Sequence, residues 1–371
     1  MTTPLYIDVH ILQDLPPSNI NRDDNGTPKQ AVYGGVTRLR VSSQSWKRAT
    51  RKQFADRLAK EQQGVRTRRL TALLTRELEE RGIDTERAVA AVTASLGELK
   101  ITGGKKDAET SYLLFCSRGQ VAAIADQLVA ALGETDDPAA AGKTVKAGDI
   151  LKDGHSLDVA LFGRMVADVT DLNVDAATQV AHAISTHAAP TQFDYFTAVD
   201  DLQEKGEPGA GMIGTVEYGS ATMYRFATVG LHQLADNLAD EDAAVDGVLE
   251  FVRAFTTSMP TGHQNSFAAR TRPALVAVVV RTDQPVSLVS AFESPVRGRE
   301  TGMMAGSQVV LAGLYSAETE RWGDRPELVV ASYQAAGDSA DALERAFGPS
   351  VGFDELLVRV GDGLRSVGAS R

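Results

Sequence analysis

The sequence predicts an α+β protein in which strands alternate with helices and one helical lobe is inserted. Alternation of apolar and polar residues in TVEYGSATMYRFATV (residues 215–229) indicates a strand, and so does the apolar, β-branched run ALVAVVV (residues 274–280). Between residues 66 and 154 the pattern is helical throughout. These three observations together favour a sheet with accompanying helices.

The N-terminal segment is expected to form two strands and the start of a helix. Residues 5–12 (LYIDVHIL) predict a first strand that stops at a Pro-Pro turn. Residues 16–33 are rich in Pro, Asn, Asp and Gly and predict a long ordered loop, a kind of segment that often carries function. Residues 36–41 predict a second strand, after which Ser42 or Ser43 can cap a helix.

The middle of the chain predicts a helical lobe inserted after the first βα unit. Its three helical segments are RTRRLTALLTRELEERG, TERAVAAVTASLGELK and RGQVAAIADQLVAALG, separated by Gly-rich or acidic breaks. Residues 158–165 (DVALFGRM) fit either a strand or a helix, and residues 175–189 predict a helix that ends at Pro190. Beyond an irregular segment at 191–214, the expected order is strand 215–229, helix 230–259, strand 273–282, helix 307–315, strand 328–332 and a final helix.

The composition is that of a globular protein, with 371 residues, 43% hydrophobic and 23% charged. Cys116 is the only cysteine, which excludes an internal disulfide and a zinc site built on paired thiolates. The sequence begins without a basic segment followed by an apolar run, and no apolar stretch reaches the length of a membrane span. We therefore expect a cytoplasmic protein without a membrane partner.

Positive charge is concentrated in one segment of an acidic chain. The net charge is −11, yet residues 36–52 (VTRLRVSSQSWKRATRK) contain six basic side chains and no Asp or Glu. Residues 22–52 hold eight basic side chains against two acidic ones, a local net charge of +6, so the other residues carry about −17. Because a ligand responds to the local potential, the acidic total does not exclude a nucleic-acid partner.

A helix that begins near Ser43 would gather its basic side chains within an arc of roughly 100° and place Trp46 and Ala49 on the opposite, core-facing side. Its N–H groups and neighbouring hydroxyls suit phosphate oxygens, which position a nucleic-acid backbone without reading its sequence. A solvated helix face is the alternative, although such faces usually mix both signs of charge. The residues of this basic surface are Gln44, Lys47, Arg48 and Arg51, preceded by Arg38 and Arg40.

Five long sequence blocks occur in order along about residues 5–230 and are specific enough to indicate a family. They are LPPSNINRDDNGTPKQAVYGG, RVSSQSWKRATRK, DVALFGRM, AHAISTHAAPTQFDYFTAVDDLQ and EYGSATMYRFA. These blocks resemble the CasC family, the repeated RAMP-type backbone subunit of Cascade, the type I-E CRISPR surveillance complex. Residues 59–154 and the C-terminal third contain no diagnostic motif.

The resemblance implies an RNA-recognition-like (ferredoxin-like) palm with a helical fingers insertion and an extended β-hairpin thumb. The expected division is palm at 1–58, 155–190 and 225–371, fingers at 59–154 and thumb at 191–224. It also implies a protein without enzymatic activity, whose copies lie side by side along a CRISPR guide RNA and leave its bases free to pair with target DNA. The other implied partners are the remaining Cascade subunits and, through the complex, a recruited nuclease-helicase.

Carried over position by position, the resemblance implies guide-RNA contacts in the first loop, at the helix start and in the FGRM segment. Tyr195 and Phe196, in the thumb, either stack on bases or anchor the root of the thumb in the core, and the residues alone leave both open. Tyr224 and Phe226 share a strand face and are expected in the core. The implied contacts are Asn21, Arg22, Ser42, Ser43, Gln44, Lys47, Arg51, Arg164 and Met165.

Two motifs that suggest cofactor or metal sites lack the required context. Gly209, Gly211 and Gly214 spell a dinucleotide fingerprint, but no buried strand precedes them and no helix follows, so a hairpin tip is expected. His182 and His187 are five residues apart and cannot share one helix face as two metal ligands do at a spacing of four. We expect neither a cofactor nor a bound metal.

Two rival functions remain. Asp23 and Asp24 can serve a metal-dependent endoribonuclease, as an acidic residue in a comparable loop does in related RNA-targeting complexes, or they hold the loop by pairing with Arg22 or capping backbone N–H groups. The second rival is a duplex-DNA regulator with the helix from Ser43 in a groove. No helix-turn-helix pair is evident to support it.

Overall fold

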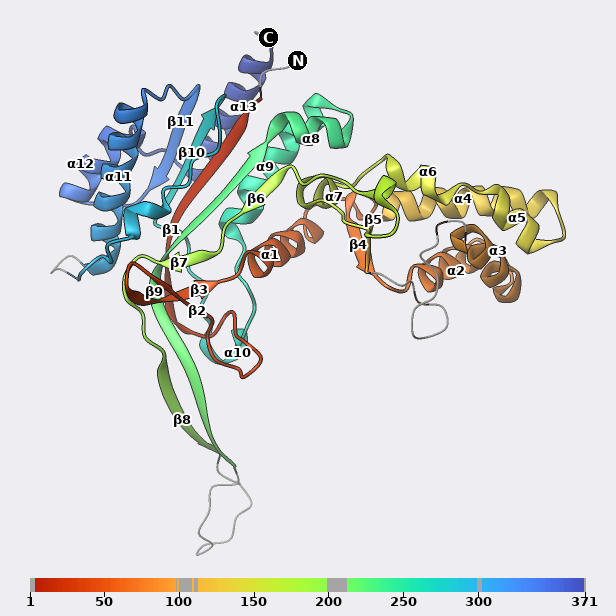
Figure 1. Cartoon of the computed structure of the whole chain (residues 1–371), viewed down its shortest axis with the longest axis horizontal. Coiled ribbons are helices and arrows are strands. Elements are labelled where there is room, and N and C mark those ends of the chain that lie inside the picture. The colour runs from red at the N-terminus through yellow and green to blue at the C-terminus, as the bar shows by residue number, and fades with distance from the viewer. Residues whose placement is uncertain are drawn as a thin grey trace, which may run out of the picture.

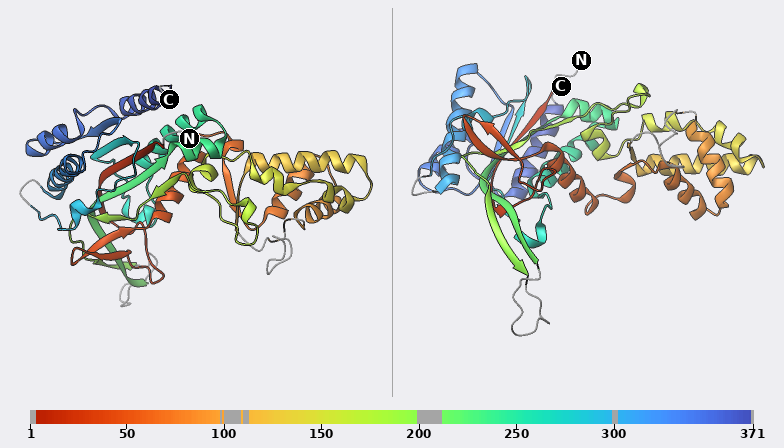
Figure 2. Two further views of the ribbon diagram at one scale, coloured as in Figure 1. Left: turned by 45° about the horizontal axis from the view of Figure 1, so that its top comes forward. Right: turned by 60° about the horizontal axis from the view of Figure 1, so that its bottom comes forward.

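The computed structural model describes residues 4–97, 99, 109, 113–198, 212–298 and 302–369. A central sheet is flanked by helices, a helical lobe extends from one side, and a long β-hairpin extends in another direction (Figure 1). Figure 2 shows the helical lobe and the hairpin in two further views. The predicted α+β class, with a palm-like sheet, a helical insertion and an extended hairpin, is confirmed.

The central sheet is antiparallel and runs in the order β11-β10-β1-β9-β7-β3-β2. β1 lies between β10 and β9, and its side chains alternate between two cores. Ile7, Val9 and Ile11 enter the core on one face, and Leu12 enters the core on the other. The strands are β1 (Tyr6–Ser18), β2 (Gln30–Tyr33), β3 (Val36–Val41), β6 (Thr178–Val180), β7 (Ala183–Ser185), β9 (Met212–Gly230), β10 (Leu275–Arg281) and β11 (Leu328–Tyr333).

Helices cover both faces of this sheet. On one face Trp46 of α1 meets Phe255 of α9 edge to face, with ring centroids 6.4 Å apart. On the other, Tyr315 and Phe347 join α11 to α12, with centroids 4.5 Å apart. The helices outside the lobe are α1 (Ser43–Ala55), α7 (Leu157–Phe162), α8 (Leu231–Leu238), α9 (Glu241–Thr257), α10 (Gln264–Phe267), α11 (Gly302–Trp322), α12 (Asp338–Phe347) and α13 (Phe353–Ala369).

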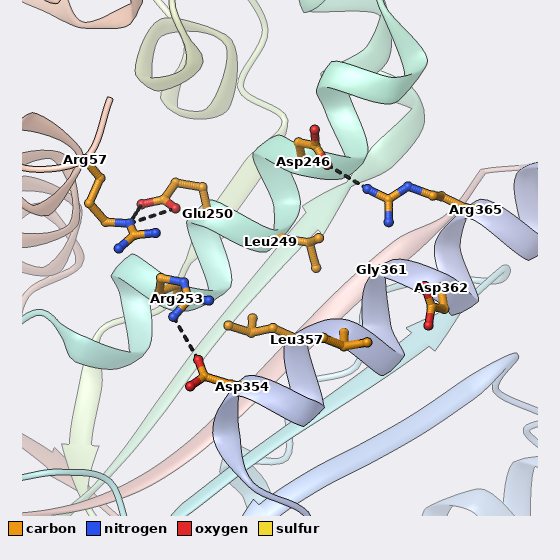
Figure 3. Close-up of a pocket in the computed structure, with 11 residues that line it drawn as sticks. Arg57, Asp246, Leu249, Glu250, Arg253, Asp354, Leu357, Gly361, Asp362 and Arg365 are labelled. Atoms are coloured by element: carbon orange, nitrogen blue, oxygen red, sulfur yellow. Dashed lines mark hydrogen bonds and ion pairs between the residues drawn. The ribbon is translucent and has the colours of Figure 1, made fainter. Parts of the chain in front are cut away.

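Ion pairs tie α9 to its neighbours around a hollow of about 520 Å³ between α9 and α13 (Figure 3). Leu249 and Leu357 line its apolar part. Each pair joins an arginine on one element to a carboxylate on another, so the rim of the hollow carries little net charge. The pairs are Arg253 with Asp354 (3.1 Å), Arg365 with Asp246 (2.7 Å) and Arg57, just after α1, with Glu250 (2.9 Å).

The helical lobe has its own hydrophobic core, in which Leu74, Val92, Ile124 and Leu128 are fully buried. The predicted helical segments correspond to α2 (Leu70–Glu80), α3 (Thr85–Gly97) and α4 (Arg118–Glu134), followed by α5 (Pro138–Thr144) and α6 (Ala147–Lys152). The lobe is not helical throughout, because β4 (Gly64–Thr67) and β5 (Leu114–Ser117) pair as a small antiparallel sheet.

The helix predicted at residues 175–189 is wrong. The segment forms β6 and β7, which pair with β9 through Gln179 opposite Thr228 and Ile184 opposite Tyr224. Pairing with a long strand outweighs a weak local helical preference. The ambiguous segment at 158–165 is helical as α7, which ends at Gly163 with φ 74°.

The first strand continues through the Pro-Pro pair instead of ending there. Pro16 and Pro17 lie where the register with β9 shifts between Leu15 and Ser18, a bulge where no ladder N–H is needed. The predicted loop at 16–33 is correspondingly shorter and is followed by β2.

The long hairpin is a direct extension of the central sheet. β8 (Gln192–Ala198) pairs with the first part of β9, and the rest of β9 pairs with β1, with no break at residue 224. Tyr224 and Phe226 are buried, as predicted. The predicted hairpin tip at Gly209 and Gly211 lies outside the described residues, and Gly214 lies within β9.

Helix boundaries in the C-terminal half differ from the prediction. Residues 230–259 form two helices, because Ala239 adopts a left-handed conformation and the Asp240 side chain caps α9 by accepting the Ala243 N–H. The final helix is divided into α12 and α13 at Gly348, where φ is 79°. Among the described residues, no helix is both long and apolar enough to cross a membrane.

Asp8, buried in β1, should make stability depend on pH. Its carboxylate lies 3.4 Å from Arg281 Nε and accepts the Val286 N–H, yet burial dominates and raises the pKa of Asp8 from 3.8 to about 6. Since the folded state binds this proton more tightly than the unfolded state, the stability it contributes is present below pH 3.8 and is lost as pH rises through about 6.

Asp8→Asn removes this titration. Urea unfolding should show the variant gaining about 2 kcal/mol relative to wild type as pH rises from about 4.5 to about 7. Parallel stability curves for the two proteins across this range would rule out Asp8 as the titrating group.

Candidate nucleic-acid interface

The start of α1 is fixed to the first loop by Asn21. Its Oδ1 accepts the Ser42 N–H at 2.7 Å, and its carbonyl accepts the Lys29 N–H at 2.9 Å. Ser42 occupies the N-cap position without a side-chain cap bond. The N–H groups of Ser43 and Gln44 have no intrahelical acceptor, since they belong to the first turn of the helix.

The side chains of α1 are divided between the core and the surface as predicted, with Trp46 and Ala49 buried and Gln44 and Arg48 exposed. The basic residues nevertheless do not form one continuous arc. Lys47 and Arg51 face α7, where Lys47 Nζ lies 5.7 Å from the centre of the Phe162 ring. Burial lowers the pKa of Lys47.

Arg51 has a structural contact of its own. Its Nε donates to Asp158 at 2.9 Å and its Nη2 donates to the Gly64 carbonyl at 3.3 Å. The side chain of Asp158 is 6% exposed, so removing Arg51 would leave a buried carboxylate without its cation. A substitution at Arg51 therefore changes stability as well as surface charge.

Arg38 is not on the surface, contrary to the sequence prediction. Its side chain is fully buried and donates to the carbonyls of Tyr33 (3.1 Å), Ser185 (3.0 Å) and Phe292 (2.7 Å). Burial lowers the pKa of Arg38. The guanidinium joins β3 to β7 and to residues 292–293, which is a structural role.

Arg164 requires the same correction, whereas Met165 beside it is exposed. The Arg164 guanidinium donates to the carbonyls of Leu172 and Leu151, at 2.5 and 2.7 Å, and the residue is 4% exposed. It fixes the helical lobe to the segment after α7. Met165 is 84% exposed and is the part of the FGRM segment that an outside molecule can touch.

The hairpin presents aromatic side chains of two kinds. Tyr195 is 64% exposed, and Phe193 on the same strand face is 68% exposed. Phe196 points to the other face and covers Gly214 of β9, where a Cβ would lie 2.5 Å from the ring. Tyr195 is therefore available for stacking, and Phe196 packs within the hairpin. The root of the hairpin is joined to β2 by a hydrogen bond from Gln30 to Thr191.

Asp23 holds the first loop in shape. Its Oδ1 accepts the N–H groups of Asn25 and Thr27 at 2.9 and 3.0 Å. This is the backbone capping foreseen from the sequence, with Arg22 bonded elsewhere.

The model of the CT1975-like protein family matches residues 7–357. This chain belongs to the CT1975-like family. The resemblance to the CasC family inferred from the sequence blocks is confirmed.

Solved structures resemble this CT1975-like chain over nearly its whole length. A chain of a "CRISPR RNA-guided surveillance complex, pre-nicking" is 34% identical, with a TM-score of 0.83, and the match covers 97% of this chain and 100% of that one. A chain of a "CRISPR RNA-guided surveillance complex" is 30% identical, with a TM-score of 0.74 and coverage of 96% and 99%. The search of curated proteins gave no match.

Sequence reasoning did not foresee that two histidines of this CT1975-like chain would pair with arginines of the predicted site. Arg22 Nη1 lies 2.5 Å from His263 Nε2, and Arg40 Nη1 lies 2.9 Å from His182 Nδ1. Because a guanidinium carries only N–H donors, each ring nitrogen is the acceptor in its pair. Burial and the nearby Arg40 and Lys29 lower the pKa of His182. No sequence spacing connects these partners, which lie 142 and 241 residues apart.

The structure thus brings together part of the predicted site. The first loop is hydrogen-bonded both to the start of α1 and to the root of the hairpin, and Lys47 contacts Phe162, the first residue of the FGRM segment. Arg38 and Arg164 support this surface from inside.

Proposed function

We propose that this chain is the guide-RNA-binding backbone subunit of a type I-E CRISPR interference complex in the cytoplasm. Copies of it would lie side by side on the guide, hold its sugar–phosphate backbone and leave the bases free to pair with target DNA. The proposal extends to contacts with the other subunits and, through the complex, with a nuclease-helicase. The surveillance-complex chains that match nearly the full length support this role.

The observation that carries the proposal is the positive surface at the start of α1, made by the half-buried Lys47 and the exposed Arg48. Lys47 and Arg48 have no carboxylate partner among the described residues, although the chain as a whole is acidic. Next to them lie the first-turn N–H groups of α1 and the side chain of Gln44. Cations combined with helix N–H groups suit phosphate oxygens of any sequence.

We propose a role without catalysis. Asp23 has one carboxylate oxygen engaged with two backbone N–H groups, which supports a structural part in the loop. Among the described residues, no cluster of three or more His, Cys, Asp or Glu side chains is placed to hold the metal ion that such a nuclease would use. No observation favours the endoribonuclease alternative.

The test compares Lys47→Gln/Arg48→Gln with wild type in binding to single-stranded RNA across a salt titration. We expect the double variant to bind about tenfold more weakly, with a log–log salt slope shallower by about one unit, because phosphate contacts release counterions. Arg51 is left unchanged, because its substitution would leave the buried carboxylate of Asp158 without an ion-pair partner.

The matched control is Arg325→Gln/Arg345→Gln, which removes the same charge from two exposed arginines near β11 and on α12. It should bind RNA as wild type does. Equal affinity of the Lys47/Arg48 variant and this control would contradict the proposed function at this surface, and so would a wild-type protein that does not bind RNA.

A further inference from the structure

Residues 259–262, at the start of the segment 259–272, lie against a side of α1 different from the one that holds Lys47 and Arg51. A Cβ on Gly262 would lie 2.6 Å from the Ile20 carbonyl oxygen, so the two backbones are in close contact. Residues 259–262 also form one wall of a hollow of about 180 Å³ whose other wall is α1, through Ser45, Arg48 and Lys52. In Figure 1, α10 lies below α1, close to the first loop.

Backbone strain is stored on both sides of α10. His263 (φ 46°, ψ 30°) and Ala268 (φ 47°, ψ 39°) are left-handed, a conformation that side chains other than Gly rarely adopt. Phe267 anchors the segment, with its ring 6.0 Å from that of Tyr218 at the root of the hairpin. The strained backbone leaves three consecutive polar side chains exposed, Gln264, Asn265 and Ser266. Strain of this kind is typical of functional segments.

The charge of this region is unusual for the chain. Residues 251–282 contain no Asp or Glu, although the protein has 49 of them in 371 residues. Arg270 and Arg272 are exposed, and the only side-chain bond of Arg270 in the described structure is a long one, 3.5 Å, to Gln264. The hollow between α9 and α13 differs, because each arginine that bridges it meets a carboxylate (Figure 3).

We propose that residues 259–272, the α10 surface, form a second contact for the backbone of single-stranded guide RNA at the base of the hairpin. The inference rests on the proposed function and deepens it. Arg270 and Arg272 would neutralise phosphates, and the amide and hydroxyl groups of residues 264–266 can bond phosphate oxygens and 2′-hydroxyls. Arg48 and Lys52, across the hollow, would make the positive surface continuous with the start of α1.

The test is Arg270→Gln/Arg272→Gln in the full chain, measured with single-stranded RNA across a salt titration. We expect affinity about tenfold below wild type and a salt slope shallower by about one unit. Arg325→Gln/Arg345→Gln is again the control and should leave both unchanged. The thermal midpoint of each variant is measured to confirm that the exposed substitutions leave the fold intact.

The outcomes separate this inference from the proposed function. If Lys47→Gln/Arg48→Gln loses affinity while Arg270→Gln/Arg272→Gln matches the control, the α10 surface is not an RNA contact and the proposed function stands. If wild type binds duplex DNA of equal length as tightly as single-stranded RNA, the assignment of the partner is overturned. If wild type binds no RNA, the proposed function is contradicted, and the inference about the α10 surface is contradicted with it.

Discussion

Arg38→Met should lower the free energy of unfolding by about 3–5 kcal/mol, since it leaves three buried carbonyl groups without their donor. Methionine fills a similar volume, so the loss comes from hydrogen bonding and not from a cavity. The affinity of the folded fraction for RNA should not change, because the side chain has no exposed surface. Urea unfolding and RNA titration below the unfolding transition measure the two effects separately.

Arg40→Met is the matched control on the same strand. Arg40 is half-buried and bonds to Gln30 and His182, so its loss should cost less than about 1 kcal/mol of stability and should weaken RNA binding. The opposite pattern, with Arg38→Met stable but defective in RNA binding, would mean that the Arg38 guanidinium leaves its buried position to contact RNA.

Arg38 and Arg48 show where sequence reasoning stops. Both are arginines in the same acid-free stretch, ten residues apart, and both were predicted to bind RNA. Arg38 is buried because Ser185 and Phe292, which lie 147 and 254 residues away in sequence, supply carbonyls around it. The local pattern locates the positive charge, but only the tertiary fold determines which guanidinium reaches the surface.

The helices and strands also divide into those that local sequence patterns predict and those that depend on the tertiary fold. The amphipathic period of α4 and the alternation along β9 are local signals, and both elements were predicted close to their true bounds. Residues 175–189 were mistaken for a helix because their conformation depends on pairing with β9, about forty to fifty residues further along the chain. Arg270 and Arg272 were overlooked for a related reason, since only the fold brings the segment that carries them to the first loop and the root of the hairpin.

Phe193→Leu/Tyr195→Leu should weaken binding of single-stranded RNA by about tenfold or more, because stacking of a base on an aromatic ring contributes about 1–3 kcal/mol. Both rings project from one face of the β8–β9 hairpin and are about two-thirds exposed, at 68% and 64%. Leucine keeps an apolar side chain on the strand, so the change removes the ring and little else.

The salt titration distinguishes this loss from that of the cationic variants. Removing stacking lowers affinity by the same factor at every salt concentration, since no phosphate contact is lost, and the log–log slope stays parallel to wild type. Val32→Ser, on β2 at 77% exposure, is a control for loss of exposed apolar surface without a ring and should bind normally. Unchanged affinity in the leucine variant would show that the rings do not contact RNA. A shallower salt slope would show that the substitutions also remove contacts between charged groups of the protein and the RNA phosphates. The result that assigns Tyr195 and Phe193 to stacking is a lower affinity with a salt slope equal to that of wild type. The hairpin would then make a contact with RNA that does not depend on charge, in addition to the contact made by the positive surface of α1.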